Sequence, residues 1–213
     1  GASIAYTRFG RPDIGLVGMS EVADTLSAIT ERSSLPVIVD GDTGFGNAVN
    51  VMRTVRLFET CGAAAIQLED QTLPKRCGHL EGKEVIPADE MVDKVKAAVD
   101  ARRGQDLVIK ARTDAAGPIG LQEAIDRLNL YAEAGADVLF ADALMSEEDI
   151  IAVTKAVPKP LSVNMGLGLL FRGTTPLIHP KRLQEIGVAM VSYPRLLSTG
   201  AARGMANAMD AFN

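Results

Sequence analysis

The sequence predicts an α/β fold built on a parallel sheet, because short β-branched runs alternate with longer amphipathic stretches along the chain. Glycines that end several of the amphipathic stretches support this division, since glycine relieves the left-handed backbone that stops a helix. Strands are expected over Leu35–Asp40, Ala63–Glu69, Leu107–Arg112, Ala136–Ala141, Pro160–Asn164 and Val188–Tyr193. Helices are expected over Ser20–Ser33, Val49–Cys61, Pro87–Arg103, Gly120–Ala134, Ser146–Val157, Pro180–Ile186 and Leu197–Phe212.

This order of elements calls for right-handed crossovers, and its closed form is an eight-stranded (β/α) barrel. Six βα units are visible, so a closed barrel would need two more. We interpret Gly1–Ser3 as the start of a loop near the end of a second strand, with a segment missing upstream. Residues 1–213 are interpreted as one domain, because no repeat or linker interrupts them. The alternative is an open, doubly wound sheet.

The composition argues against several classes of partner. The 213 residues are 47% hydrophobic and include no Trp, so the core must be largely aliphatic. A net charge of −5 without a long basic run argues against nucleic acid, and the apolar runs are too short to cross a membrane. No secretion signal is seen, and the two cysteines do not make a disulfide framework. A reducing cytoplasm is the simplest compartment.

Each predicted strand is mainly apolar until its carboxyl end, where it becomes polar. Asp40 and Asp42 should point into the same mouth, because residues two apart in a strand point the same way. The later strands end in Glu69 and Asp70, in Arg112 and Asp114, in Asp142 and in Asn164. Barrel enzymes place their chemistry at this edge, so these residues form the candidate site.

Several carboxylates that face one cavity would repel one another, and a hard divalent cation such as Mg²⁺ or Mn²⁺ would relieve this repulsion. Zinc is less suitable, because few His and Cys residues lie nearby. Alternatively, these acids cap the helices that follow them. Arg112 could grip a carboxylate or phosphate, or it could neutralise Asp40 or Glu69, and one role does not exclude the other.

A long loop separates Glu69 from the helix that begins near Pro87. Its notable side chains are Lys75, Arg76, Cys77, His79 and Lys83, so three cations and a His surround one thiol. Nearby positive charge makes a thiol usable as an acid or nucleophile, and glycines in the loop would let it close over a site. The alternative is an exposed basic loop with an incidental cysteine.

Five segments, taken in order, resemble signatures of the isocitrate lyase and phosphoenolpyruvate mutase superfamily. They are Gly10–Leu16, Asp40–Asn47, Gln67–Gln71, Lys75–His79 and Ala111–Ala115, and the resemblance runs from Gly1 to about Phe212. The Lys75–His79 segment looks like the catalytic loop of the lyase branch. The resemblance implies a (β/α)₈ TIM-type barrel and a homotetramer in which neighbours exchange the last helix.

The resemblance also implies roles for individual residues. Asp40 would bind Mg²⁺ directly, and Asp42, Glu69 and Asp13 would hold the ion partly through water, with Mn²⁺ as an alternative ion. A small carboxylate substrate would contact Gly1 and Ala2 through their backbone, together with Arg112, Asp142, Asn164 and Thr175. Cys77 would be the general acid on a mobile loop, with Lys75, His79 and Arg112 completing the catalytic set.

The implied reaction is Mg²⁺-dependent cleavage of a carbon–carbon bond in a small 2-hydroxy di- or tricarboxylate. Isocitrate, 2-methylisocitrate and dimethylmalate exemplify this class, and the products are a 2-oxo acid and a carboxylate. Three features depart from the lyase pattern: Asp142 replaces a longer Glu, Lys110 charges a usually apolar strand position, and Gly166–Gly173 is longer and more apolar. The alternatives are a carboxyphosphonoenolpyruvate phosphonomutase, an oxaloacetate hydrolase or decarboxylase, and a non-catalytic metabolite-binding barrel.

Overall fold

A computed structural model of the chain describes residues 1–77, 82–166 and 175–212. In chain order its elements are α1 (Ala2–Phe9), α2 (Met19–Thr30), β1 (Ile38–Asp40), α3 (Ala48–Thr60), β2 (Ala65–Glu69), α4 (Ala88–Ala101), β3 (Val108–Thr113), α5 (Leu121–Glu133), β4 (Val138–Ala141), α6 (Glu147–Ala156), β5 (Leu161–Asn164), α7 (Pro180–Glu185), β6 (Met190–Ser192) and α8 (Leu196–Phe212). Strands and helices therefore alternate from β1 onward, as the sequence predicts.

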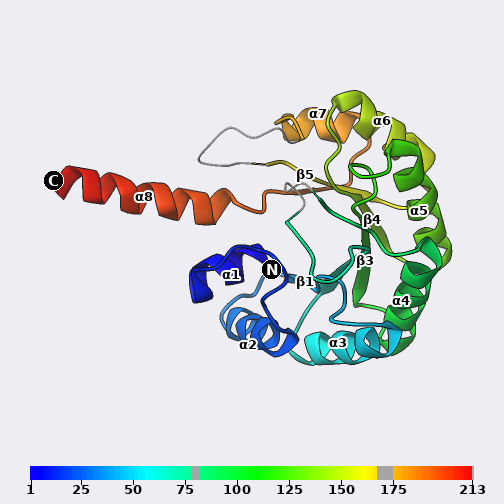
Figure 1. The fold of residues 1–213 in the computed structure, drawn as a ribbon, viewed down its shortest axis with the longest axis horizontal. Coiled ribbons are helices and arrows are strands. Elements are labelled where there is room, and N and C mark those ends of the chain that lie inside the picture. The colour runs from blue at the N-terminus through cyan, green and yellow to red at the C-terminus, as the bar shows by residue number, and fades with distance from the viewer. Residues whose placement is uncertain (78–81, 167–174, 213) are drawn as a thin grey trace.

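The six strands form one parallel sheet in the order β1-β2-β3-β4-β5-β6. Figure 1 shows the sheet curled, with α3 to α7 wrapped around its outer side. This arrangement is part of a (β/α) barrel, which confirms the predicted fold class. The doubly wound alternative is wrong, because such a sheet reverses its strand order at a switch point and this sheet does not.

Each strand lies at its predicted place and begins one to three residues later than predicted. One expectation is wrong: Gly1–Ser3 does not open a loop, because Ala2 and Ser3 begin helix α1. This helix buries Ala5 and ends at Gly10, whose φ of 58° is in the left-handed region that favours glycine. The glycines that follow three of the predicted helices, Gly62, Gly135 and Gly187, also have positive φ.

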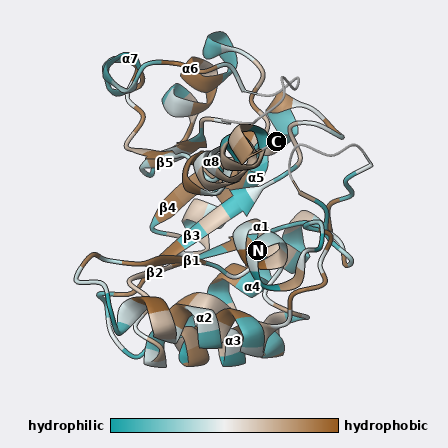
Figure 2. Ribbon diagram, turned by 90° about the vertical axis from the view of Figure 1, so that its left-hand side faces the viewer, coloured by the Kyte–Doolittle hydropathy of each residue, from teal (hydrophilic) through white to brown (hydrophobic). Residues whose placement is uncertain are grey.

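The two faces of the sheet have different chemistry because side chains alternate along each strand. In β3, Ile109 and Ala111 belong to the core that the strands form with the outer helices. Lys110 and Arg112 instead line a cavity on the concave side. Figure 2 shows hydrophobic and hydrophilic stretches on the same helices, as expected where one side packs on a sheet and the other faces water.

Helix α8 projects away from the rest of the molecule, as Figure 1 shows. It has no buried residue, and the side chains of Leu197 and Phe212 are more than four-fifths exposed. Across the described ranges, no helix combines the length and the apolar character needed to cross a membrane. Most of the Gly166–Gly173 stretch lies outside the described residues.

Phe58 on α3 offers a test of the core. Its side chain is fully buried and packs edge-to-face on Phe45, with ring centroids 6.2 Å apart. We expect Phe58→Ala to lower the free energy of unfolding by about 3–5 kcal/mol, because it leaves a cavity. Val49→Ala on the same helix is the matched control, since Val49 is 73% exposed, and it should cost under about 0.5 kcal/mol. Urea denaturation measures both, and similar losses would contradict this account.

Candidate active site

The carboxyl ends of the strands surround a cavity of about 360 Å³. Nine of the predicted site residues line it: Gly1, Ala2, Asp13, Asp40, Lys75, Cys77, Arg112, Asp142 and Asn164. Asp42 and Glu69 are buried beside them, and Thr175 is buried but does not line the cavity. His79 lies outside the described residues. Most of the site residues predicted from the sequence therefore lie together on the concave side of the sheet.

Lys75 neutralises two of the predicted metal ligands. Its Nζ lies 2.9 Å from Asp13 Oδ1 and 2.8 Å from Asp42 Oδ1, and its side chain is 4% exposed. Burial alone would lower the pKa of Lys75, but Glu69 and the neighbouring aspartates outweigh burial and raise it. Lys75 is therefore positively charged at neutral pH.

Asp40 contacts the backbone of Gly1 and makes no direct contact with Lys75. The amino nitrogen of Gly1 lies 2.7 Å from Asp40 Oδ2. Burial opposes ionisation of Asp40, whereas the positive charges of Lys75 and Arg112 favour it. Burial and the charge of Asp40 raise the pKa of Asp42, because two close carboxylates resist being ionised together.

Gly1 lies close to Asp13, Asp40 and Asp42, which we call the acidic group. A Cβ atom added to Gly1 would lie 2.8 Å from Asp42 Oδ1, 3.1 Å from Lys75 Nζ and 3.2 Å from Asp13 Oδ1. A side chain at this position would therefore force the polar groups apart. Only glycine lets the backbone come this close to the carboxylates.

One carboxylate oxygen of Glu69 has no hydrogen-bond partner among the described residues. Its Oε1 atom is buried without a hydrogen bond, and its Oε2 atom lies 3.4 Å from Arg112 Nη1. Burial raises the pKa of Glu69 well above its ordinary value, although Arg112 opposes that shift. A buried acid with an unpaired oxygen is a favourable ligand for a cation.

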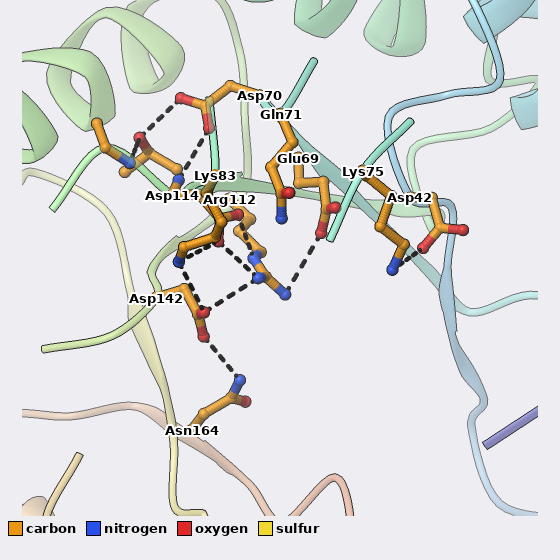
Figure 3. Close-up of polar contacts among 12 residues, drawn as sticks. Asp42, Glu69, Asp70, Gln71, Lys75, Lys83, Arg112, Asp114, Asp142 and Asn164 are labelled. Atoms are coloured by element: carbon orange, nitrogen blue, oxygen red, sulfur yellow. Dashed lines mark hydrogen bonds and ion pairs between the residues drawn. The ribbon is translucent and has the colours of Figure 1, made fainter. Parts of the chain in front are cut away.

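Arg112 is held in place by carboxylates on both sides (Figure 3). Its Nε and Nη2 atoms each donate to Asp114 at 2.8 Å, and Nη2 also donates to Asp142 at 3.1 Å. The guanidinium lies over the ring of Phe140, with Cζ 5.2 Å from the ring centroid. The paired contact with Asp114 fixes the plane of the guanidinium and directs its Nη1 edge toward Glu69.

Lys83 and Asn164 complete this cluster. Lys83 Nζ lies 2.9 Å from Asp114 Oδ1 and 3.7 Å from Asp142 Oδ2, and Asn164 Nδ2 donates to Asp142 Oδ1 at 3.1 Å. Burial would raise the pKa of Asp114, but Arg112 and Lys83 lower it to about 2. Asp114 is therefore ionised at neutral pH.

The cation that contacts Cys77 was not among those predicted from its loop. Lys75 and Lys83 pair with carboxylates instead, and Arg195 Nη2 donates to Cys77 Sγ at 3.1 Å. Arg195 lies between β6 and α8, far along the chain, so no local pattern indicated the contact. The backbone nitrogen of Cys77 donates to the Asp13 carbonyl at 3.1 Å, which joins the loop to the acidic group.

Within residues 1–77, 82–166 and 175–212, no three acidic, His or Cys side chains converge closely enough to enclose a metal ion. Lys75 and the Gly1 nitrogen contact Asp13, Asp40 and Asp42 instead. The donor set itself consists of carboxylate oxygens, which hard cations prefer, and Glu69 Oε1 lacks a partner. The chemistry of the residues therefore fits a divalent cation.

The phosphoenolpyruvate phosphomutase family matches residues 1–213, the whole chain. The chain belongs to this family. Among its relatives is 2,3-dimethylmalate lyase of Eubacterium barkeri, 46% identical over 88% of this chain and 64% of that protein. A 2-methylisocitrate lyase of Aeropyrum pernix is 50% identical over 86% of this chain and 58% of its own length. The chain thus spans less than two-thirds of the length of these relatives.

Solved structures of family members share this fold. A 2,3-dimethylmalate lyase, described as a PEP mutase/isocitrate lyase superfamily member, has a TM-score of 0.92 with 34% identity, over 99% of this chain and 70% of that one. Oxaloacetate acetylhydrolase in complex with 3,3-difluorooxalacetate also has a TM-score of 0.92, with 33% identity over 97% of this chain and 70% of that one. Phosphonopyruvate hydrolase in complex with oxalate and Mg²⁺ has a TM-score of 0.80, with 31% identity over 99% of this chain and 72% of that one.

Asp70 stabilises the backbone and side chains next to the cluster of Arg112, Asp114, Asp142, Lys83 and Asn164. Its carboxylate accepts hydrogen bonds from the Asp114 backbone nitrogen at 2.8 Å, Thr113 Oγ1 at 2.7 Å, Tyr131 OH at 2.8 Å and Arg127 Nη1 at 3.1 Å. These donors come from β3, the residue that follows it, and α5, so Asp70 joins three segments of the chain. It thereby fixes the backbone that presents Asp114 to Arg112.

We expect Asp70→Asn to lower the free energy of unfolding by about 2–3 kcal/mol, because it weakens several hydrogen bonds to a buried carboxylate and leaves Arg127 with Glu123 as its remaining acidic partner. Tyr131→Phe is the matched control, since it removes one hydrogen bond from the same carboxylate and should cost about 1 kcal/mol. Urea denaturation followed by circular dichroism compares the two. Equal losses would mean that the charge of Asp70 has no special structural role.

Proposed function

We propose that this chain carries the active site of a Mg²⁺-dependent lyase that cleaves a carbon–carbon bond in a small 2-hydroxy di- or tricarboxylate. The products would be a 2-oxo acid and a second carboxylate. The observation that carries the proposal is that a fixed guanidinium, an acidic group and a free thiol border one cavity. The curated relatives with the lyase names support the same reaction class.

Asp40, Asp42, Glu69 and Asp13 would hold the metal ion, Asp40 directly and the others partly through water. The unpaired Oε1 atom of Glu69 supports this assignment, as does the fit of Gly1 against the acids. Bound Mg²⁺ would stabilise the negative charge that develops on substrate oxygens during cleavage, and Mn²⁺ could replace it. Lys75 would add a permanent positive charge beside these oxygens.

Arg112 would hold a substrate carboxylate, because Asp114 and Asp142 already fix its orientation. Asp142 and Asn164 line the cavity close by, and the backbone of Gly1 and Ala2 borders its other part. These groups would position the substrate between the acidic cluster and Arg112. Thr175 is proposed to add a substrate contact and His79 a catalytic group.

Cys77 would act as the general acid. After a base has taken the hydroxyl proton, the carbon–carbon bond breaks and the hydroxyl oxygen becomes the carbonyl oxygen of the 2-oxo acid. The bonding electron pair passes to a carbon of the second carboxylate, and Cys77 Sγ gives that carbon its proton. Arg195, which donates to Sγ, would stabilise the thiolate that remains.

We further propose that the enzyme is a cytoplasmic homotetramer in which neighbours exchange α8. The helix has no buried residue, and its apolar side chains at Leu197, Met205, Met209 and Phe212 need a surface to cover them. A reducing compartment would keep Cys77 as the free thiol that the mechanism requires. Small carboxylates are the proposed ligands, and neither nucleic acid nor membrane is expected to bind.

The general-acid role predicts that Cys77→Ser lowers kcat about 10²- to 10⁴-fold while leaving substrate affinity nearly unchanged. The full-length protein with Mg²⁺ is assayed against a panel of 2-hydroxy di- and tricarboxylates, with release of glyoxylate or pyruvate as the signal. Cys61→Ser is the control, because Cys61 ends α3 and does not line the cavity. If no member of the panel is cleaved but oxaloacetate or a phosphonate is converted, the lyase proposal is wrong. The protein would then be a hydrolase or a phosphonomutase.

The metal assignment predicts a thermal shift that needs no activity. At a Mg²⁺ concentration about 100-fold above Kd, binding should stabilise the wild type by about 2.7 kcal/mol and raise Tm. Asp40→Asn should abolish most of this gain, because it removes the directly binding carboxylate. Asp126→Asn on the exposed side of α5 should keep it. A Mg²⁺-dependent shift of equal size in all three proteins would refute the assignment.

A further inference from the structure

Lys110 is a buried cation without a counter-ion. It lies in β3 two residues before Arg112, on the same side of the strand, and both side chains line the cavity. The Lys110 side chain is 2% exposed. Among the described residues it makes no hydrogen bond or ion pair, and its charged group rests over the Phe140 ring with Nζ 4.6 Å from the centroid.

Burying an unpaired charge is unfavourable, and buried lysines are usually paired. The charges of Asp40 and Asp142 favour the protonated form of Lys110 without contacting it, and Asp142 already contacts Arg112, Lys83 and Asn164. Burial, with Arg112 adding to it, lowers the pKa of Lys110 to about 8, so most of the molecules carry the charge at neutral pH. Among the described residues no acid pairs directly with Lys110, so a bound ligand is a source of a directly paired anion.

Gln67 gives this position a second polar group. The strand register places Gln67 of β2 directly beside Lys110, and Gln67 also lines the cavity. Among the described residues, its side-chain amide makes no hydrogen bond. A lysine and an amide side by side on a cavity wall form a site suited to one carboxylate.

We propose that Lys110, with Gln67, binds a second carboxylate of the substrate while Arg112 holds the first, so that the site selects dicarboxylates over monocarboxylates. Residues two apart in a strand have Cα atoms roughly 6.6 Å apart, a spacing that two flexible side chains can adapt to a four-carbon diacid. This inference rests on one part of the proposed function, namely that Arg112 binds a substrate carboxylate. Lys110 is thus a specificity-determining residue.

Calorimetric titration tests the proposal without requiring turnover. The full-length protein with Mg²⁺ is titrated with succinate, a dicarboxylate, and with propionate, which lacks the second carboxylate. Lys110→Met should weaken succinate binding about 10- to 100-fold, the value of a hydrogen bond to a charged group, and change propionate binding less than about twofold. Lys110→Arg should retain most of the preference for succinate, because it keeps the charge.

Lys110→Met replaces an unpaired charge with an apolar side chain of similar length, so its Tm should equal or exceed that of the wild type. Unchanged succinate binding, or an equal loss for both ligands, would overturn the proposal. A succinate preference that depends on Lys110 would support it even in a protein that cleaves no member of the lyase panel. Lyase activity with an unaltered preference for dicarboxylates in Lys110→Met would overturn it and leave the lyase function standing.

Discussion

The paired hydrogen bonds between Arg112 and Asp114 determine how the concave side of the sheet is organised. Asp114 is held from behind by Asp70 through its backbone nitrogen, and Arg112 extends from Asp114 to Asp142 and Glu69. One guanidinium therefore connects the ends of β2, β3 and β4. Because its orientation is set by protein carboxylates, little free energy would be lost in ordering it when a ligand binds.

The site contains two groups of buried charges, one around Arg112 and one around Lys75, and they differ in the ratio of acidic to basic side chains. Around Arg112 the acids and cations neutralise one another, with Lys83 adding a second positive charge against Asp114 and Asp142. Around Lys75 several acids share few cations, and Glu69 Oε1 has no partner. Isolated buried charge is strongly unfavourable in a protein interior, so an excess of acid at one end favours a bound cation there.

The positions of the site residues could be predicted from the sequence, but their pairings could not. Alternation and the polar strand ends placed Asp40 and Arg112 correctly at one edge of the sheet, since both depend on local periodicity. The contact between Arg195 and Cys77 joins residues far apart in the chain, and only the tertiary structure brings them together. Helix α1 was missed because Gly1–Ser3 carries no capping side chain, and its burial at Ala5 supplies the stability that the local sequence lacks.

The two uncompensated groups in the site have opposite sign and lie on different strands. Glu69 Oε1 at the end of β2 calls for a cation, whereas Lys110 inside β3 calls for an anion. A metal ion with a chelated polycarboxylate would satisfy both, because the ion faces the acids while a distant carboxylate reaches the lysine. Each ligand then makes the other more favourable: the metal lowers the repulsion between substrate and acids, and the substrate supplies oxygen ligands to the metal. On this proposal, the substrate carboxylate farthest from the metal lies against β3, where Lys110 lines the cavity beside Gln67.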